Sequence, residues 1–156
     1  MQNTLRNLRR FAFPTLLIFS VLGIINAGYL TLTAFAGVSP TCNFLHGCAE
    51  VASSPYSKVF GIPLALFGVF FYSIVAGFSL WGMIDNKAPV YNFILVLTVL
   101  GFILSLYFLY LQAFIIQAFC EYCLFSLFDA TVLLLTTLFF LPKKSSPIKQ
   151  KLSNNI

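Results

Sequence analysis

The chain of 156 residues contains four cysteines, which form two pairs along the sequence: Cys42 with Cys48, and Cys120 with Cys123. Cysteine can attack disulfides, bind soft metals or form structural cross-links, so all three chemistries are candidates. The segment between Cys42 and Cys48 includes Gly47 and can close on itself. Because a ring this small gains little by cross-linking the unfolded chain, structural stapling is the weaker hypothesis for this pair.

The second pair forms a C-x-x-C motif, Cys120-Glu121-Tyr122-Cys123, where an apolar segment begins. If that segment is a helix, a spacing of three brings the two sulfurs to disulfide distance. The first turn of a helix has unpaired N–H groups and the positive end of the dipole, which lower the pKa of a thiol there. Glu121 opposes this shift. The motif therefore favours thiol–disulfide exchange near neutral pH.

The composition places these cysteines in a membrane protein. Only 8% of the residues are charged and 60% are hydrophobic, whereas soluble proteins have about 25% charged residues. A membrane-spanning helix needs about 20 mostly apolar residues. Four such segments occur, at about 11–37, 61–83, 90–111 and 121–141. We predict an all-α integral membrane protein: one four-helix domain over residues 1–156, with the surplus of the third segment, 112–119, at the outer interface.

The basic residues predict how the helices are oriented. With four spans both termini lie on one side, together with eight lysines and arginines, whereas only Lys58 lies on the other side. The eight are Arg6, Arg9, Arg10, Lys87, Lys143, Lys144, Lys149 and Lys151. Positive residues mark the cytoplasmic face, so we expect a multi-pass protein of the cell (inner) membrane. Both termini are then cytoplasmic, and all four cysteines face the outer, periplasmic compartment, where disulfides persist.

Nucleic-acid binding, signal-peptide cleavage and zinc binding are less compatible with these patterns. A net charge of +5 can indicate nucleic-acid binding, but here the charges lie at the chain ends and beside apolar segments. Ala34-Phe35-Ala36 resembles a signal-peptide cleavage site, but the preceding apolar segment exceeds the usual 7–15 residues. The cysteines, with His46 between the first two, could bind zinc; an oxidising compartment disfavours four free thiolates, so we expect no metal and an exposed His46.

The cysteines and their surroundings resemble the vitamin K epoxide reductase (VKOR) family, in particular its bacterial members that act like the DsbB quinone reductase. The likeness covers Thr15 to Leu141. It rests on Cys42, Cys48, Ser53-Ser54-Pro55, Gly61-Ile62-Pro63-Leu64-Ala65-Leu66-Phe67-Gly68, Tyr72 and Cys120-x-x-Cys123. The resemblance implies a four-helix bundle around a quinone, capped by the cysteine loop and a short interfacial half-helix.

The resemblance also implies a function and roles for individual residues. Electrons from an exported DsbA-like or thioredoxin-like protein would enter at Cys42/Cys48, pass to Cys120/Cys123 and reduce a membrane quinone of the ubiquinone or menaquinone type. Cys120 would exchange with the loop, and Cys123 would face the quinone. The positions that match the family's quinone pocket are Ser54, Phe67 and Phe71.

The chain departs from the family pattern at two positions. Relatives that reduce the vitamin K epoxide have an asparagine where this chain has Leu64, and a tyrosine where it has Leu127. Plain quinone reduction is therefore favoured, with reduction of vitamin K-type quinone or its epoxide as the alternative. A non-enzymatic membrane protein with two structural disulfides is the third hypothesis. We expect no fused thioredoxin-like domain, and hence a separate redox partner.

Asp129 and Asn26 are polar residues inside the predicted spans. Asp129 is six residues past Cys123, or about 9 Å deeper along a helix. An intramembrane carboxyl is costly and is a functional candidate by default, so a proton path to the quinone is one hypothesis. The other, which we favour, is a protonated Asp129 that is hydrogen-bonded within the bundle, for example to Asn26 or a serine. Asn26 is expected to bond between helices.

Overall fold

A computed structural model describes residues 2–44, 46–84 and 90–140 of the chain. Its helices are α1 (Gln2–Ala36), α2 (Cys48–Ser53), the 3-10 helix η1 (Pro55–Ser57), α3 (Leu64–Ile84), α4 (Val90–Tyr110), the π-helix η2 (Leu111–Ile116) and α5 (Glu121–Phe140). Two short strands, β1 (Lys58–Val59) and β2 (Ile62–Pro63), pair antiparallel.

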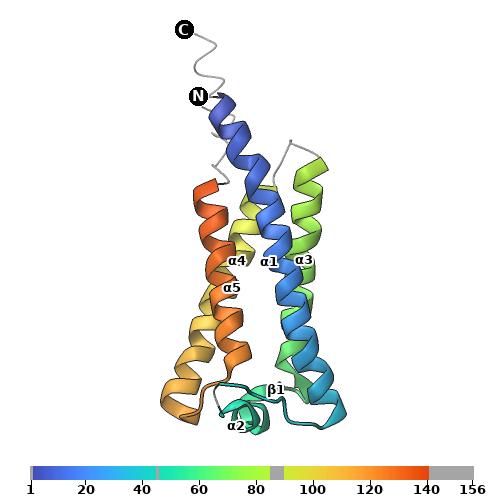
Figure 1. The fold of residues 1–156 in the computed structure, drawn as a ribbon, viewed down its shortest axis with the longest axis vertical. Coiled ribbons are helices and arrows are strands. Elements are labelled where there is room, and N and C mark those ends of the chain that lie inside the picture. Colours follow the sequence, from blue (N-terminus) through green and yellow to red (C-terminus); the bar gives the residue numbers. More distant parts are fainter. Residues whose placement is uncertain (1, 45, 85–89, 141–156) are drawn as a thin grey trace.

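Four helices are long and apolar enough to cross a bilayer. The candidate spans are Phe11–Ala36, Leu64–Ile84, Tyr91–Ile116 and Glu121–Phe139. The long helices run along one common direction, with α2 and the β-hairpin at one end of the bundle (Figure 1). We call this the cysteine end, and the end where α1 begins and α5 finishes the opposite end. The predicted all-α integral membrane fold is confirmed.

Helix α1 packs against both α3 and α5, and α4 packs mainly on α5. Aromatic rings fill the places where glycine leaves room between helices: the Tyr72 ring lies on Gly23, and the Phe13 ring lies on Gly82. Small residues let helices approach closely where lipid supplies no hydrophobic drive for association. The buried apolar core comprises Ala12, Phe13, Leu16, Ala27, Tyr72, Val75, Ile94 and Leu133.

Turns at the cysteine end set the helix boundaries there. Gly37 ends α1 with φ +67°, and the N–H of Val38 bonds back to the Thr33 carbonyl at 3.0 Å. This is the left-handed helix ending that glycine adopts at little cost. The sequence places the start of the second span at Gly61, whereas α3 begins at Leu64, because residues 58–63 form the hairpin.

The third span is longer than its sequence-based boundary. Residues 111–116 continue α4 as the π-helix η2, so Gln112 lies within a helix, whereas the sequence assigns it to a separate interfacial segment. Gln117 then adopts a left-handed conformation, with φ +55°, and the N–H of Ala118 bonds to the Gln112 carbonyl at 3.2 Å. This sharp turn brings the chain directly to Cys120 and the start of α5.

Much of the charge pattern used to predict orientation lies outside the described residues. Lys87, Lys143, Lys144, Lys149 and Lys151 are among those residues, as is Leu141, the predicted end of the fourth span. The assignment of the cysteine end to the outer face therefore stays a prediction.

Candidate functional site: two cysteine pairs at one cavity

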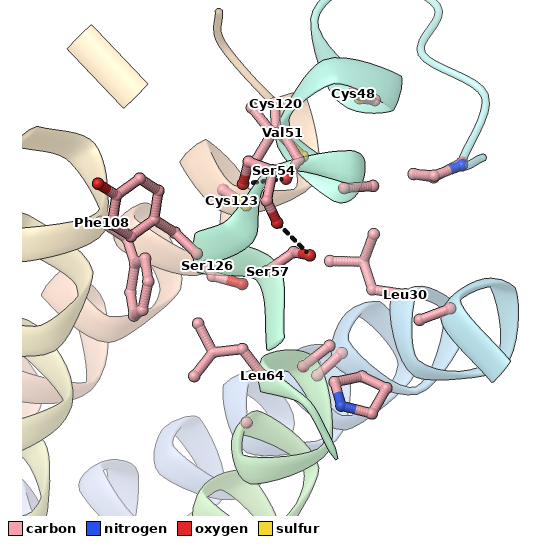
Figure 2. A pocket seen from close by; sticks show the side chains of 18 of the residues that line it. Leu30, Cys48, Val51, Ser54, Ser57, Leu64, Phe108, Cys120, Cys123 and Ser126 are labelled. Carbon is pink, nitrogen blue, oxygen red and sulfur yellow. Dashed lines mark hydrogen bonds between the residues drawn. The ribbon is translucent and has the colours of Figure 1, made fainter. Parts of the chain in front are cut away.

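A cavity of about 440 Å³ opens at the cysteine end. All four long helices contribute to its wall, together with α2, η1 and η2. Three of the four cysteines line it: Cys48 from α2, and Cys120 and Cys123 from the start of α5. Figure 2 shows these cysteines together with Ser54 around the same space. Two cysteine pairs that are distant in the sequence thus meet at one site.

The loop cysteines differ in their access to solvent. Cys42 and Cys48 are joined by a disulfide, with their Cα atoms 5.8 Å apart. Cys48 is 1% exposed and faces the cavity. Cys42 is only partly buried and lies outside the cavity lining. The disulfide therefore connects a partly exposed cysteine with one that is buried and lines the cavity.

The C-x-x-C cysteines are free thiols in this structure. The pKa of Cys120 is lowered to about 7, chiefly because the Cys123 thiol hydrogen-bonds to it and also because the backbone N–H groups of Cys123 and Tyr122 do. Burial and the Glu121 carboxylate act in the opposite direction. Cys120 is therefore poised to be a thiolate near neutral pH, the direction expected for a thiol at a helix start.

Gln112 is a site residue that the sequence analysis does not identify. Its side chain is 3% exposed, lines the cavity and accepts a hydrogen bond from the Cys120 N–H at 2.8 Å. The same side chain lies within hydrogen-bonding reach of the Cys123 thiol. Gln112 thus orients the backbone of one cysteine and the sulfur of the other. A lone amide inside an apolar segment, eight residues before a C-x-x-C motif, is the available sequence signal, and π-helical turns of this kind are frequent at functional sites.

Gly47 brings the cysteine loop against the chain that precedes Cys120. A Cβ atom at this position would lie 2.7 Å from the N and 2.8 Å from the O of Phe119. Contacts under 3.0 Å with backbone atoms leave no room for a side chain. Gly47 is therefore required for close approach. Gly47 precedes Cys48 and Phe119 precedes Cys120, so this contact brings the two cysteine segments together.

The three predicted quinone residues lie around the cavity. Ser54, Phe67 and Phe71 all line it. The Ser54 hydroxyl donates to the Val51 carbonyl at 2.7 Å, while Phe67 is 49% exposed and reaches the bundle surface. Their role in binding stays a prediction, because a shared cavity shows proximity alone.

The cavity fits a quinone in size and character. Ligand pockets commonly measure about 300–1,000 Å³ and are mostly apolar with a few polar groups. Here the apolar wall comes mainly from the long helices, and the polar groups, among them Ser54, Ser57 and Gln112, lie at the cysteine end. The residues that would hold a quinone there are the apolar side chains of the helices and these polar groups, with Cys123 in the same cavity wall.

Of the two polar residues singled out inside the spans, Asn26 pairs as expected and Asp129 does not. Asn26 donates to the Ser126 hydroxyl at 2.9 Å and to the Tyr122 carbonyl at 3.1 Å, so its interhelical bonding is as predicted. The expected bond from Asp129 to Asn26 or a serine is wrong, because Asn26 is engaged one helical turn nearer the cysteines. Asp129 is fully buried, and neither carboxyl oxygen has a hydrogen-bond partner among the described residues. The Tyr72 side chain lies close enough to interact with it electrostatically.

The cysteines do not gather with other ligands into a metal site. Within residues 2–44, 46–84 and 90–140, no group of three or more His, Cys, Asp or Glu side chains could hold a metal ion. His46 is exposed in the loop.

No curated protein sequence matches this chain significantly. The sequence model described as "Vitamin K epoxide reductase family", however, matches residues 14–138. This range includes all four cysteines and all four spans except residues 11–13 of the first and Phe139 of the fourth. Proteins of this family are membrane oxidoreductases that use quinones. The chain belongs to the vitamin K epoxide reductase family.

Proposed function

We propose that this protein is a quinone-dependent thiol oxidase. It takes two electrons from a separate exported protein with a DsbA-like or thioredoxin-like dithiol and passes them to a membrane quinone, which supports disulfide formation outside the cytoplasm. One observation carries the proposal: Cys48, Cys120 and Cys123 line a single apolar cavity, while the disulfide partner of Cys48 is accessible. Two inert structural disulfides would not need one loop cysteine in the cavity wall and the other outside it.

The accessibility of the loop cysteines supports an order for the first exchange. A thiolate of the partner attacks the sulfur of Cys42, which is the accessible member of the pair, and Cys48 leaves as a thiolate. The second thiol of the partner then displaces Cys42. The partner is now a disulfide, and the loop holds the two electrons as a pair of thiols.

The second exchange moves the electrons from the loop to the C-x-x-C motif. Before this exchange, Cys120 and Cys123 are joined by a disulfide. The Cys48 thiolate attacks Cys120, and the bond between Cys120 and Cys123 breaks. Cys42 next attacks Cys48, the loop disulfide forms again, and Cys120 leaves as a thiolate. A leaving thiol with a lower pKa departs faster, so the lowered pKa of Cys120 favours this step.

The final step oxidises the Cys120–Cys123 dithiol back to its disulfide. In this step the two thiols lose two electrons and two protons as the sulfur–sulfur bond forms, and a quinone, when bound in the cavity, would supply the two-electron acceptor. Cys123 lines the cavity from the first turn of α5, which supports its assignment as the cysteine nearer the acceptor. Leu64 also lies in the cavity wall; it offers no polar group to an epoxide, which supports quinone over epoxide as the substrate.

The test is oxidation of a reduced DsbA-like protein by the purified chain with a short-chain ubiquinone or menaquinone analogue. Wild type should produce one quinol per partner disulfide. Cys42→Ala, Cys48→Ala, Cys120→Ala and Cys123→Ala should each lose at least about 1,000-fold in turnover, as removal of a catalytic nucleophile does. Ser73→Ala, on an exposed face of α3, should match wild type. Retention of turnover by Cys123→Ala would contradict the proposal.

A further inference from the structure

The residue that follows Cys120 holds the backbone of the cysteine loop. The Glu121 carboxylate accepts the Asn43 N–H with both oxygens, at 3.1 and 3.2 Å, and the Phe44 N–H at 3.1 Å. Hydrogen bonds to a charged acceptor are roughly twice as strong as neutral ones. Both donors lie directly after Cys42, so the carboxylate fixes one side of the loop disulfide.

The next residue holds the other side of Cys42. The Tyr122 hydroxyl donates to the Thr41 carbonyl at 2.9 Å. Its ring lies against the Tyr29 ring of α1, with centroids 5.2 Å apart, and the Tyr29 hydroxyl is 3.4 Å from Thr41 Oγ1. Tyr122 is thereby supported from α1 while it holds Thr41. The described hydrogen bonds of Glu121 and of the Tyr122 hydroxyl to the loop all go to backbone groups.

The charge of Glu121 acts on the Cys120 thiol as well as on the loop. A carboxylate next to Cys120 raises the pKa of that thiol and so makes Cys120 a slower leaving group in the exchange with the loop. An acid at this position therefore lowers the reactivity of Cys120. The loop contact offsets that loss, because it holds the loop cysteines beside the cysteine with which they exchange.

We propose that Glu121 and Tyr122 are positioning residues that dock the cysteine loop so that Cys48 faces Cys120. They occupy the two positions between the reactive cysteines, so any displacement of the loop from them is also a displacement from both thiols. The Gly47 contact holds the segment before Cys48 in the same arrangement. This inference rests on the proposed function only in taking Cys48-to-Cys120 exchange as a step.

The test measures docking without quinone or partner. In full-length Cys42→Ala/Cys123→Ala protein, only Cys48 and Cys120 can form a disulfide. Equilibration with glutathione redox buffers gives the effective molarity of that pair. Glu121→Ala should lower it about 10- to 100-fold, and Tyr122→Phe about three- to tenfold, as expected for losing charged and neutral hydrogen bonds. Glu121→Gln keeps an acceptor and should fall between Glu121→Ala and the parent.

Matched controls separate docking from general effects of charge or hydroxyl loss. Glu50→Ala removes an exposed carboxylate from α2, and Tyr110→Phe removes an exposed hydroxyl from α4; both should stay within twofold of the parent. Thermal unfolding identifies any variant that fails to fold, and Tyr122→Phe and Glu121→Gln are conservative enough to decide the matter. If Glu121→Ala and Tyr122→Phe also stay within twofold, the inference is overturned, even where the oxidase assay succeeds. A drop in effective molarity supports docking, even where the oxidase assay fails.

Discussion

The two ends of the bundle are held together in different ways. At the opposite end, apolar side chains such as Leu16, Ile94 and Leu133 are fully buried. Three of the buried hydroxyls there bond within their own helices. These bonds run from Ser79 to Val75, from Thr98 to Ile94 and from Thr137 to Leu133, at 2.7 to 2.9 Å. This end is therefore stabilised by packing between helices, and these three hydroxyls require no partner on another helix.

At the cysteine end, polar contacts connect segments that are far apart in the sequence. Gln112 bonds Cys120 across eight residues, and Glu121 bonds Asn43 across 78. These contacts surround a cavity. Because no side chains pack inside it, hydrogen bonds hold the residues of its wall in position. We therefore expect substitutions at the opposite end to change mainly the free energy of unfolding, and substitutions at the cysteine end to change mainly thiol exchange.

The largest effect is expected from loss of packing at the opposite end. Leu133→Ala removes a fully buried side chain and should lower the free energy of unfolding by about 2 kcal/mol or more. Thermal or denaturant unfolding in detergent measures this. Leu135→Ala, at a position 46% exposed, should cost less than about 1 kcal/mol. Exchange between the cysteine pairs in folded Leu133→Ala protein should equal wild type, and a slower exchange would break the separation of the two halves.

The second effect concerns the close approach of Gly47 to Phe119. Gly47→Ala places a Cβ atom 2.7 Å from a backbone nitrogen, so the loop must shift. Electron transfer from the reduced loop to the C-x-x-C pair should slow at least about tenfold, since misplacement of reacting atoms by about 1 Å can cost 100-fold. Quenched-flow alkylation follows the transfer. The matched control is Gly77→Ala, where an added Cβ meets nothing within 4 Å; equal rates in the two variants would exclude the contact as a determinant.

The sequence predicts the membrane fold and the positions of the cysteines well, because apolar segments and cysteine spacing are local features. It does not predict Gln112 as a site residue, since a π-helical turn depends on packing and leaves no periodic signal. Nor does it show that Glu121 holds the loop, because that contact joins residues 78 apart. From the sequence alone Glu121 is only a charge that opposes thiolate formation. The predicted pairing of Asp129 is also wrong, since register between helices fixes which polar groups meet.

Gln112 tests whether polar contacts position the thiols. Gln112→Leu keeps the size of the side chain but leaves the buried Cys120 N–H without its acceptor, at a cost of about 1–3 kcal/mol. Turnover should fall about tenfold, with a smaller loss of unfolding free energy than in Leu133→Ala. Asn92→Leu, at an exposed position of α4, serves as the control. A turnover equal to wild type in Gln112→Leu would show that α5 orients its cysteines unaided.

The ionisation of Cys120 provides a finer measure of the same contacts. Because its pKa is lowered to about 7, the alkylation rate of Cys120 in reduced protein should rise about tenfold per pH unit below 7 and level off above it. Cys123→Ala removes the hydrogen bond that lowers this pKa most, so the midpoint should move up toward 9.0. Glu121→Gln should move it down. An unchanged midpoint in Cys123→Ala would mean that the helix start alone tunes the thiol.

The smallest effect is expected at Asp129, between the two halves. Its carboxyl group is fully buried, lacks a hydrogen-bond partner among the described residues and lies outside the cavity lining, although the next residue, Ala130, is part of that lining. Asparagine has nearly the shape of a protonated carboxyl group, so Asp129→Asn should change neither turnover nor its pH profile. Steady-state quinol production from mildly acidic to mildly alkaline pH measures both. If Asp129→Asn removes a limb of that profile, the carboxyl group exchanges protons with the quinone, and the reactive half includes residues outside the cavity lining.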